Sequence, residues 1–259
     1  MPDKKVSLTI IVPVYNSEQY IKKNILKLYE KLKDLNNDFE LIVVDDGSSD
    51  QTRKILSLLK DNLSKLRLIF LSKNFGKGMA IRKGILRSSG KYIIYYDCDL
   101  PYFNKLTKLY KELIKSKNDF VMITREKQLN RSKNDFVMIS REKNIYKNFL
   151  YFLRRRFSYL YSRFASFLIK GNYDDTQAGL KGFKSKDKRF ISRFKTNGFL
   201  FDLEIIRIIT ERKLNIKKIF SKSNIENYNL SYVYSFKFYF KIIIDYIRII
   251  YFISFKKYG

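Results

Sequence analysis

Residues 92–100 of this 259-residue chain read Tyr-Ile-Ile-Tyr-Tyr-Asp-Cys-Asp-Leu. The apolar first half predicts a buried β-strand, and that strand ends in two carboxylates, Asp97 and Asp99. Open α/β folds bind ligands beyond the carboxyl ends of their strands, so acidic oxygens at this edge indicate a binding site. Asp-x-Asp is common by chance, and the alternative interpretation is an acidic turn without a ligand.

The chain on both sides of this stretch alternates strand-like and helical segments. Apolar runs predict strands near residues 6–14, 39–44 and 66–71, and apolar residues at helical spacing predict helices at 17–35, 52–63 and 79–88. This alternation predicts an α/β fold with a mostly parallel sheet flanked by helices. Polar residues follow the strand ends, and we expect them to form one site: Tyr15, Asp45, Asp46, Lys77, Asp97 and Asp99.

The amino-acid composition excludes several kinds of chemistry. The chain has no histidine, and its single cysteine is Cys98. An internal disulfide, a cysteine-based zinc site and a histidine general base are therefore excluded. Any bound metal must have oxygen ligands, which favours Mg²⁺, Mn²⁺ or Ca²⁺.

The chain is strongly basic, with 53 Lys and Arg against 25 Asp and Glu and a net charge of +28. This charge favours a polyanionic partner: nucleic acid, an anionic membrane surface or a phosphorylated substrate. The alternative is a composition bias, since Lys, Asn, Ile, Tyr and Phe are all abundant. The polar start of the chain runs directly into a strand and predicts no signal peptide, so we expect a location on the cytoplasmic side.

A tandem duplication follows the predicted sheet segments. Residues 115–127 recur, with two substitutions, as residues 131–143. Two copies are too few for a solenoid, which indicates a local duplication. One copy of Asp-Phe-Val-Met-Ile is expected to supply a strand of the sheet, and the sequence leaves open which copy does so.

Two further segments have the pattern of membrane-surface helices. Residues 145–170 mix aromatic and basic side chains, and residues 231–255 are mostly Ile, Phe and Tyr. The four charges of the second segment are spaced to form one stripe along a helix: Lys237, Lys241, Asp245 and Arg248. We predict an interfacial helix there, within a membrane-associating segment 216–259 that follows a catalytic unit of residues 1–215. The alternative is a core helix packed on the sheet, and a membrane-anchoring partner protein is left open.

Four segments, in order, resemble family 2 glycosyltransferases of the GT-A fold. They are Val-Pro-Val-Tyr-Asn at 12–16, Val-Val-Asp-Asp-Gly-Ser-Ser-Asp at 43–50, Asn-Phe-Gly-Lys-Gly at 74–78 and Asp-Cys-Asp-Leu at 97–100. Residues 175–183 and 201–204 are similar to the branch that makes dolichyl- or polyprenyl-phosphate sugars, the dolichyl-phosphate β-glucosyltransferases and mannosyltransferases. The resemblance covers residues 6–215.

The resemblance implies roles for residues on the donor side. Pro13 and Tyr15 would line the nucleotide pocket, and Asp45 would contact the base or ribose. Asp46 and Lys77 would also belong to the donor site. Asp97 and Asp99 would hold Mg²⁺ or Mn²⁺ on the diphosphate, and Asp97 is thereby also a donor-binding residue.

The resemblance also implies an acceptor site for a lipid phosphate. Thr124-Arg125 and its duplicate Ser140-Arg141 both resemble the Ser-Arg pair that binds phosphate, and the duplication leaves the choice between Arg125 and Arg141 open. The cluster Arg154-Arg155-Arg156, with Ser158, resembles a second basic site. Asp175 or Asp174 would orient the sugar or the acceptor, unless it is a structural turn residue.

The activity implied is inverting transfer of a hexose from UDP-glucose or GDP-mannose to dolichyl or polyprenyl phosphate at the cytoplasmic face of a membrane. A phosphate acceptor arrives as an oxyanion and needs orientation rather than a general base. The alternative is an enzyme of the same fold that acts on a hydroxyl of a glycan or glycolipid. A nucleic-acid binder is a third hypothesis, motivated by charge alone, and we expect no nucleic-acid partner.

Overall fold

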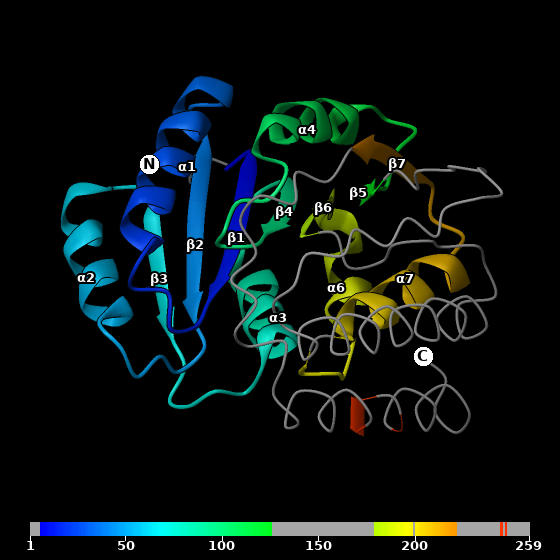
Figure 1. Ribbon diagram of the computed structural model, residues 1–259. Coiled ribbons are helices and arrows are strands. Elements are labelled where there is room, and N and C mark those ends of the chain that lie inside the picture. Colours follow the sequence, from blue (N-terminus) through cyan, green and yellow to red (C-terminus); the bar gives the residue numbers. More distant parts are fainter. Residues whose placement is uncertain (1–5, 126–178, 199, 222–243, 246, 248–259) are drawn as a thin grey trace, which may run out of the picture.

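A seven-stranded sheet forms the centre of the computed structural model, which describes residues 6–125, 179–198, 200–221, 244, 245 and 247 (Figure 1). The strands are β1 (Leu8–Val14), β2 (Phe39–Asp45), β3 (Leu66–Phe70), β4 (Tyr92–Tyr96), β5 (Phe120–Arg125), β6 (Leu180–Lys184) and β7 (Ile216–Ser221). The α-helices are α1 (Ile21–Leu35), α2 (Thr52–Asn62), α3 (Lys77–Arg87), α4 (Leu106–Ile114), α6 (Lys188–Ile191) and α7 (Phe201–Glu211). Two 3₁₀ turns, η1 (Phe103–Lys105) and η2 (Ser185–Asp187), lead into α4 and α6.

The strand order is β3-β2-β1-β4-β6-β5-β7. Every neighbouring pair is parallel except those of β6, which runs antiparallel to both β4 and β5. From β1 the chain builds outward to β2 and β3 on one side and then places β4 on the other. The β1–β4 boundary is therefore the topological switch point, where open α/β sheets bind ligands beyond the strand ends.

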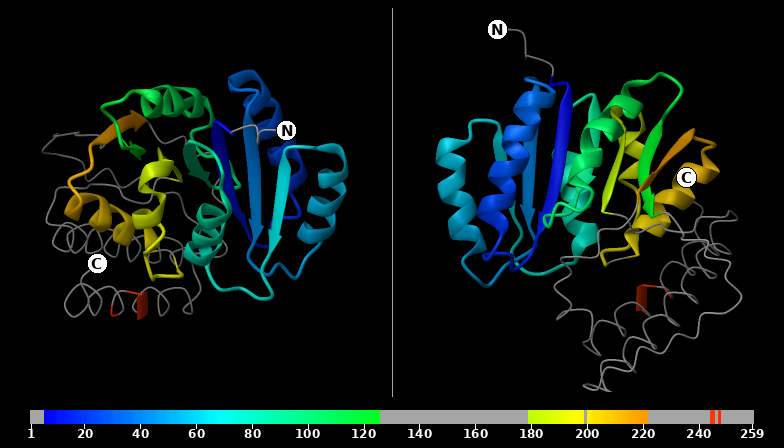
Figure 2. Two further views of the ribbon diagram at one scale, coloured as in Figure 1. Left: turned by 180° about the vertical axis from the view of Figure 1, so that it is seen from behind. Right: turned by 45° about the horizontal axis from the view of Figure 1, so that its top comes forward.

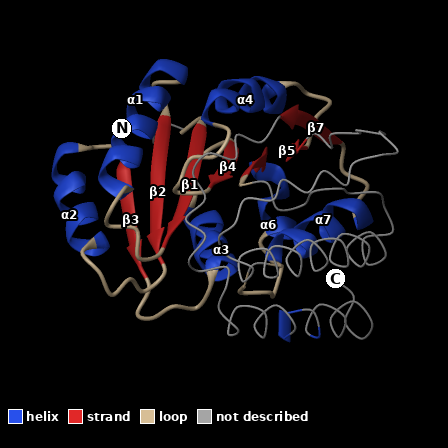
Figure 3. Cartoon of the chain, in the orientation of Figure 1, coloured by secondary structure: helices blue, strands red, loops and turns tan. Residues whose placement is uncertain are grey.

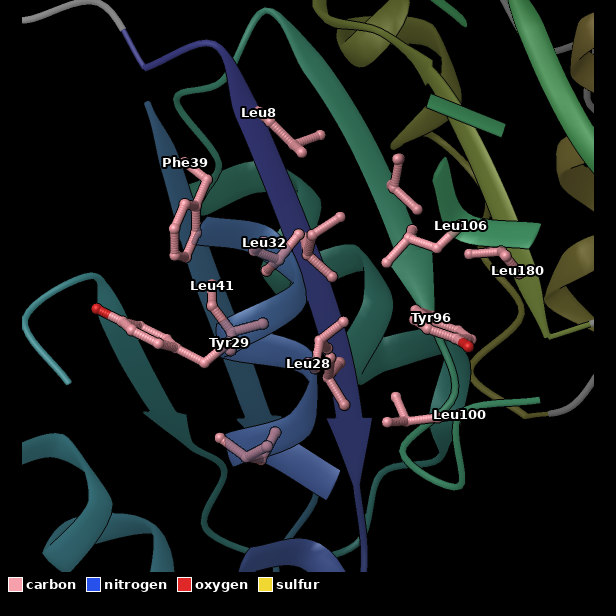
Figure 4. Packing of buried hydrophobic residues seen from close by; sticks show 14 of the residues in the cluster. Leu8, Leu28, Tyr29, Leu32, Phe39, Leu41, Tyr96, Leu100, Leu106 and Leu180 are labelled. Carbon is pink, nitrogen blue, oxygen red and sulfur yellow. The ribbon is translucent and has the colours of Figure 1, made fainter. Parts of the chain in front are cut away.

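Helices cover both faces of the sheet, as Figures 2 and 3 show. All seven residues of β1 and all seven of β2 are buried, which explains why both strands are mostly apolar, with Thr9 and Glu40 as buried polar residues. Side chains of α1, α2 and α4 pack on one face, and those of α3, α6 and α7 pack on the other. On the first face, Leu28 and Leu32 of α1 lie over β1 (Figure 4). The predicted α/β fold with a mostly parallel, helix-flanked sheet is confirmed.

The duplicated segment contributes its first copy to the sheet. Phe120–Arg125 forms β5, which pairs with β6 on one side and β7 on the other. The second copy, residues 131–143, lies outside the described residues.

The segment that begins at residue 216 starts inside the sheet. Ile216–Ser221 forms β7 and pairs with β5 along its whole length. The predicted interfacial segment 145–170 and most of 222–259 lie outside the described residues. Among the helices that the structure describes, none combines the length and the apolar character needed to span a bilayer.

Candidate active site

The predicted donor-side residues gather at the carboxyl ends of β1, β2 and β4. Pro13 is buried inside β1, and Tyr15 follows that strand with 38% of its surface exposed. Pairing between β1 and β4 ends at Ile11 and Tyr95, two residues before Pro13, which has no N–H to donate. The two strands therefore separate at the switch point, where Asp97 follows β4.

A tight turn brings Asp97 and Asp99 to the same edge. The Leu100 N–H donates to the Asp97 carbonyl oxygen at 3.0 Å, and Leu100 has a φ of 53°, in the left-handed region. Both carboxylates therefore lie just beyond the carboxyl end of β4. Cys98, between them, is directed toward α1, since its Sγ lies 3.7 Å from both Ser17 Oγ and Tyr20 Oη.

Asp97 is held from two sides. Its carboxylate Oδ1 lies 2.6 Å from Lys77 Nζ, and its backbone N–H donates to the Gly179 carbonyl at 2.9 Å. A Cβ built at Gly179 would lie 2.6 Å from Asp97 Cγ and overlap the carboxylate. Burial alone would lower the pKa of Lys77, but the carboxylates of Asp97 and Asp202 outweigh it and raise that pKa, so the ammonium stays charged.

Asp99 carries the perturbed carboxyl of the pair. Loss of water around the group and the nearby charge of Asp97 raise the pKa of Asp99 to about 6. Part of the side chain remains exposed, and solvent screens some of the repulsion. Two carboxylates that repel one another favour binding of a cation between them.

These residues fit a hard divalent cation. The described part of the chain has no cluster of three or more His, Cys, Asp or Glu residues suited to a metal. Asp97 and Asp99 would therefore supply two oxygen ligands, with diphosphate and water oxygens completing the shell, which is the usual arrangement for Mg²⁺.

A cation held by Asp99 would bind in a pH-dependent way. The group is protonated below a pH of about 6, and a cation binds only the ionised form, so affinity should be lost as the pH falls through 6. We expect Mn²⁺ affinity at pH 5 to be about tenfold below that at pH 7.5, with a much flatter profile in Asp99→Asn. Titration of Mn²⁺ by electron paramagnetic resonance would measure it, and the chain has no histidine to titrate in the same range. An unchanged affinity across this range would contradict the assignment of Asp99.

Asp45 and Asp46 both bind protein groups. Asp45 is fully buried, and its carboxylate accepts hydrogen bonds from Arg53 Nε at 2.6 Å and from the Ser48 N–H at 3.2 Å. Asp46 accepts the N–H groups of Phe75 and Gly76, both at 2.8 Å, and so fixes the loop that leads to Lys77. Both residues lie at the carboxyl end of β2, where the sequence predicts them, and both carboxylates are bonded to neighbouring protein groups.

Arg53 was not predicted from the sequence. It stands in the first turn of α2, its guanidinium is anchored by Asp45 and by the Leu71 carbonyl, and its side chain is 39% exposed. The only sequence signal was a basic residue in the first turn of a helix, where the helix dipole disfavours a cation.

A second group with no predicted role is Asp202, in the segment 201–204 that carries part of the resemblance, and its charge acts on Lys77. Asp202, the second residue of α7, accepts a hydrogen bond from Tyr95 Oη at 2.9 Å and an ion pair from Lys181 Nζ at 3.1 Å. Two residues further on, Glu204 accepts the N–H groups of Lys195 and Thr196 at 2.7 and 2.8 Å. Each carboxylate of α7's first turn is thus bonded to the protein.

The predicted acceptor-side residues are described only in part. Arg125 is the last residue of β5, which runs parallel to β4, so its backbone lies at the same sheet edge as Asp97. The other predicted residues lie outside the described residues: Arg141, Arg154, Arg155, Ser158 and Asp175.

Two curated relatives match most of the chain. The dolichyl-phosphate beta-glucosyltransferase of Dictyostelium discoideum is 30% identical over 227 residues, which cover 83% of this chain and 65% of that protein. The Homo sapiens protein of the same name is 31% identical over 224 residues, which cover 82% and 65%. The chain thus spans just under two thirds of the length of these relatives.

A solved structure and a family profile complete the comparison. The glucosyl-3-phosphoglycerate synthase from Mycobacterium tuberculosis, in complex with Mn²⁺, uridine diphosphate and phosphoglyceric acid, superposes with a TM-score of 0.63 at 15% identity, covering 94% of this chain and 78% of that one. At this identity the likeness concerns the fold, which is of the GT-A type. The profile described as "Glycosyl transferase family 2" matches residues 9–186, well over half of the sequence. With the acidic turn at the switch point and the ordered strand-end residues, this match shows that the chain belongs to glycosyl transferase family 2.

Proposed function

We propose that this chain transfers a hexose from a nucleotide sugar to the phosphate of a dolichyl or other polyprenyl lipid. The observation that carries the proposal is the Asp97–Asp99 turn at the β1–β4 switch point, with Lys77 2.6 Å from Asp97. The names of the two curated relatives favour glucose, hence UDP-glucose over GDP-mannose as the donor.

The donor diphosphate would lie against Asp97, Asp99 and Lys77. A divalent cation, Mg²⁺ or Mn²⁺, would supply Lewis-acid stabilisation of the leaving diphosphate. Lys77 adds a fixed positive charge at the same place, on a loop that Asp46 holds rigid. Arg53, which is bonded to Asp45 and 39% exposed, would face the nucleoside.

The reaction would be a single in-line displacement. A phosphate oxygen of the lipid forms the new bond to the anomeric carbon, and the bond from that carbon to the diphosphate breaks with its electron pair. The configuration at the anomeric carbon is inverted, and the nucleoside diphosphate leaves. An ionised phosphate carries no proton that must be removed, so the step needs no general base.

The bonding of nearby carboxylates supports a phosphate acceptor over a hydroxyl. A hydroxyl acceptor needs a carboxylate free to take its proton. Among the described residues near the site, Asp45, Asp46, Asp202 and Glu204 all bond to protein donors, and Asp97 and Asp99 form the proposed metal pair. The basic residues predicted to hold the lipid phosphate, Arg125 or Arg141 with Arg154, Arg155 and Ser158, remain part of the proposal, as does Asp175 as a group that orients the sugar.

The experiment is a panel of donors and acceptors with the full chain. Incubation with UDP-glucose or GDP-mannose, Mn²⁺ and dolichyl phosphate should give a sugar that extracts with the lipid. Transfer to a glycolipid hydroxyl, with none to dolichyl or undecaprenyl phosphate, would overturn the proposed acceptor. No transfer from either donor would overturn the proposed reaction.

We also propose that the enzyme works at the cytoplasmic membrane surface. Asp245 is 5% exposed, and a Cβ on Gly198 would lie 2.9 Å from its Cγ, whereas Ile247 is 62% exposed. At these residues of the C-terminal segment the charge faces the catalytic domain and the aliphatic side chain faces outward. That arrangement supports a surface with apolar contact to lipid.

Ile247→Glu tests this orientation. Loss of one buried isoleucine side chain removes about 2 kcal/mol of transfer free energy, so partitioning onto anionic phosphatidylserine vesicles should weaken roughly thirtyfold. The matched control is Leu58→Glu, since Leu58 on α2 is also exposed, at 59%, and lies far along the chain. Equal losses for both variants, or no loss for Ile247→Glu, would contradict the proposal. Vesicle flotation measures the bound fraction.

A further inference from the structure

A buried ion pair lies next to Lys77 and has no part in the reaction proposed above. Lys181 is fully buried and Asp202 is 3% exposed. Lys181 stands beside Tyr95 in the β4–β6 register, and both side chains reach Asp202 Oδ1, at 3.1 and 2.9 Å. Such a pair is weak evidence for stability, because apolar residues of the same size often serve the fold as well or better. Its presence next to the site therefore suggests a role in positioning.

The starts of α3 and α7 bring Asp202 close to Lys77. α3 begins at Lys77 and α7 begins at Phe201. A Cβ on Gly78 would lie 2.9 Å from Phe201 Cβ, so the two helix starts are in close contact. Lys77 Nζ lies 6.0 Å from the centre of the Phe201 ring, one residue before Asp202. Lys77 thus contacts Asp97 and lies close enough to Asp202 for the charge of that carboxylate to act on it.

We propose that Asp202, fixed by Lys181 and Tyr95, is the second counter-ion of Lys77 and allows Lys77 to release Asp97 to a divalent cation. The inference rests on the metal site of the proposed function. Asp202 is a positioning residue in this scheme, since it acts through Lys77.

The physical basis is competition for one carboxylate. Lys77 and a divalent cation both bind Asp97, and the cation must displace or share the ammonium. A half-buried ammonium that loses its only counter-ion is strongly disfavoured. Asp202 offers Lys77 a remaining carboxylate and so lowers the free energy of that displacement. Metal affinity should then depend on Asp202 only while Lys77 is present.

A double-mutant cycle on Mn²⁺ affinity tests this dependence. The full chain is titrated with Mn²⁺ without donor, and free Mn²⁺ is followed by electron paramagnetic resonance. We expect Lys77→Met to tighten Mn²⁺ binding, and Asp202→Asn to weaken it about tenfold. In the Lys77→Met background, Asp202→Asn should have no further effect, because the competitor is gone.

Two further variants separate positioning from folding. Asp202→Asn leaves Lys181 buried without its counter-ion. The double variant Lys181→Met/Asp202→Asn replaces the ion pair with a neutral pair and should fold. It should bind Mn²⁺ as weakly as Asp202→Asn alone. The control is Glu40→Gln: Glu40 is similarly buried on β2 and binds Thr9 and Ser89, and its neutralisation should leave Mn²⁺ affinity unchanged.

The outcomes distinguish this inference from the proposed function. If the wild-type chain binds no Mn²⁺, both the metal site and this inference are wrong. If the wild-type chain binds Mn²⁺, and both Asp202→Asn and the neutral pair bind it as tightly as the wild type does, only the inference is overturned. The inference is also overturned if Asp202→Asn weakens binding as much in the Lys77→Met background as in the wild type.

Discussion

Asp97→Asn should lower kcat by roughly a thousandfold while the protein stays folded. The substitution keeps the shape of the side chain but removes the charge that faces Lys77 at 2.6 Å and, as proposed, one of two carboxylate ligands of the cation. Lewis-acid stabilisation of a leaving diphosphate contributes several kcal/mol, and each 1.36 kcal/mol is a factor of ten in rate. Steady-state transfer to dolichyl phosphate measures the loss, and Mn²⁺ affinity should fall with it.

The control for this variant is Asp119→Asn. Asp119 precedes β5 at the opposite edge of the sheet, where its carboxylate pairs with Lys186 at 2.7 Å and accepts the Asn215 N–H at 3.1 Å. Its neutralisation should lower stability and leave kcat within about twofold, as expected for a charge remote from the site. Undiminished transfer by Asp97→Asn would refute the role of the acidic turn.

Gly179→Ala should reduce kcat about a hundredfold through a single methyl group. The new Cβ would lie 2.6 Å from Asp97 Cγ, against a group that the Lys77 ion pair and the Gly179 carbonyl hold in place. The carboxylate must therefore shift, and a displacement of about 1 Å in a catalytic group costs on the order of a hundredfold in rate. Donor and metal titrations should show weaker binding as well.

Gly182→Ala is the matched variant for that substitution. It lies three residues further along, and its Cβ would meet Ile94 Cγ1 at 2.9 Å and Leu113 Cδ2 at 3.0 Å, all apolar atoms. Overpacking there should lower the free energy of unfolding by about 1–3 kcal/mol and leave kcat nearly unchanged. Comparable kcat losses for the two variants would mean that Gly179 acts through general packing rather than through Asp97.

The architecture could be predicted because, in the first hundred residues, the hydrophobic periodicity and the turn residues between segments indicated the same elements. The runs ending at Val14 and Asp45 were mostly apolar, apart from Thr9 and Glu40, as expected for strands buried on both faces. Helix starts were less certain: α1 begins at Ile21 rather than near residue 17, because the preceding residues form turns. Helix ends and caps depend on local hydrogen bonds that periodicity does not encode.

The positions of the site residues were predictable, but their partners were not. Strand ends indicated Asp45, Asp46, Lys77 and Asp97 because parallel strands end at one edge. Two pairings depend on tertiary packing that a linear sequence does not show. Asp45 faces Arg53, and Asp202 bonds to Lys181 and, across 107 residues, to Tyr95. The sequence likewise did not determine which copy of the duplicated segment forms a strand of the sheet, because both copies have the same pattern.

The duplication gives the chain a second copy of the sequence that forms β5, one of the seven strands that the structure describes. Residues 120–125 supply β5, and residues 136–141 repeat them with a single Thr-to-Ser difference. A shift of 16 residues is even, so the second copy would present the same side chains to the same faces of the sheet. The extra loop length costs only about 0.6 kcal/mol for each doubling. After deletion of either copy, the chain would still contain one segment that can form β5. A duplication of this kind can therefore be inherited without damage to the fold.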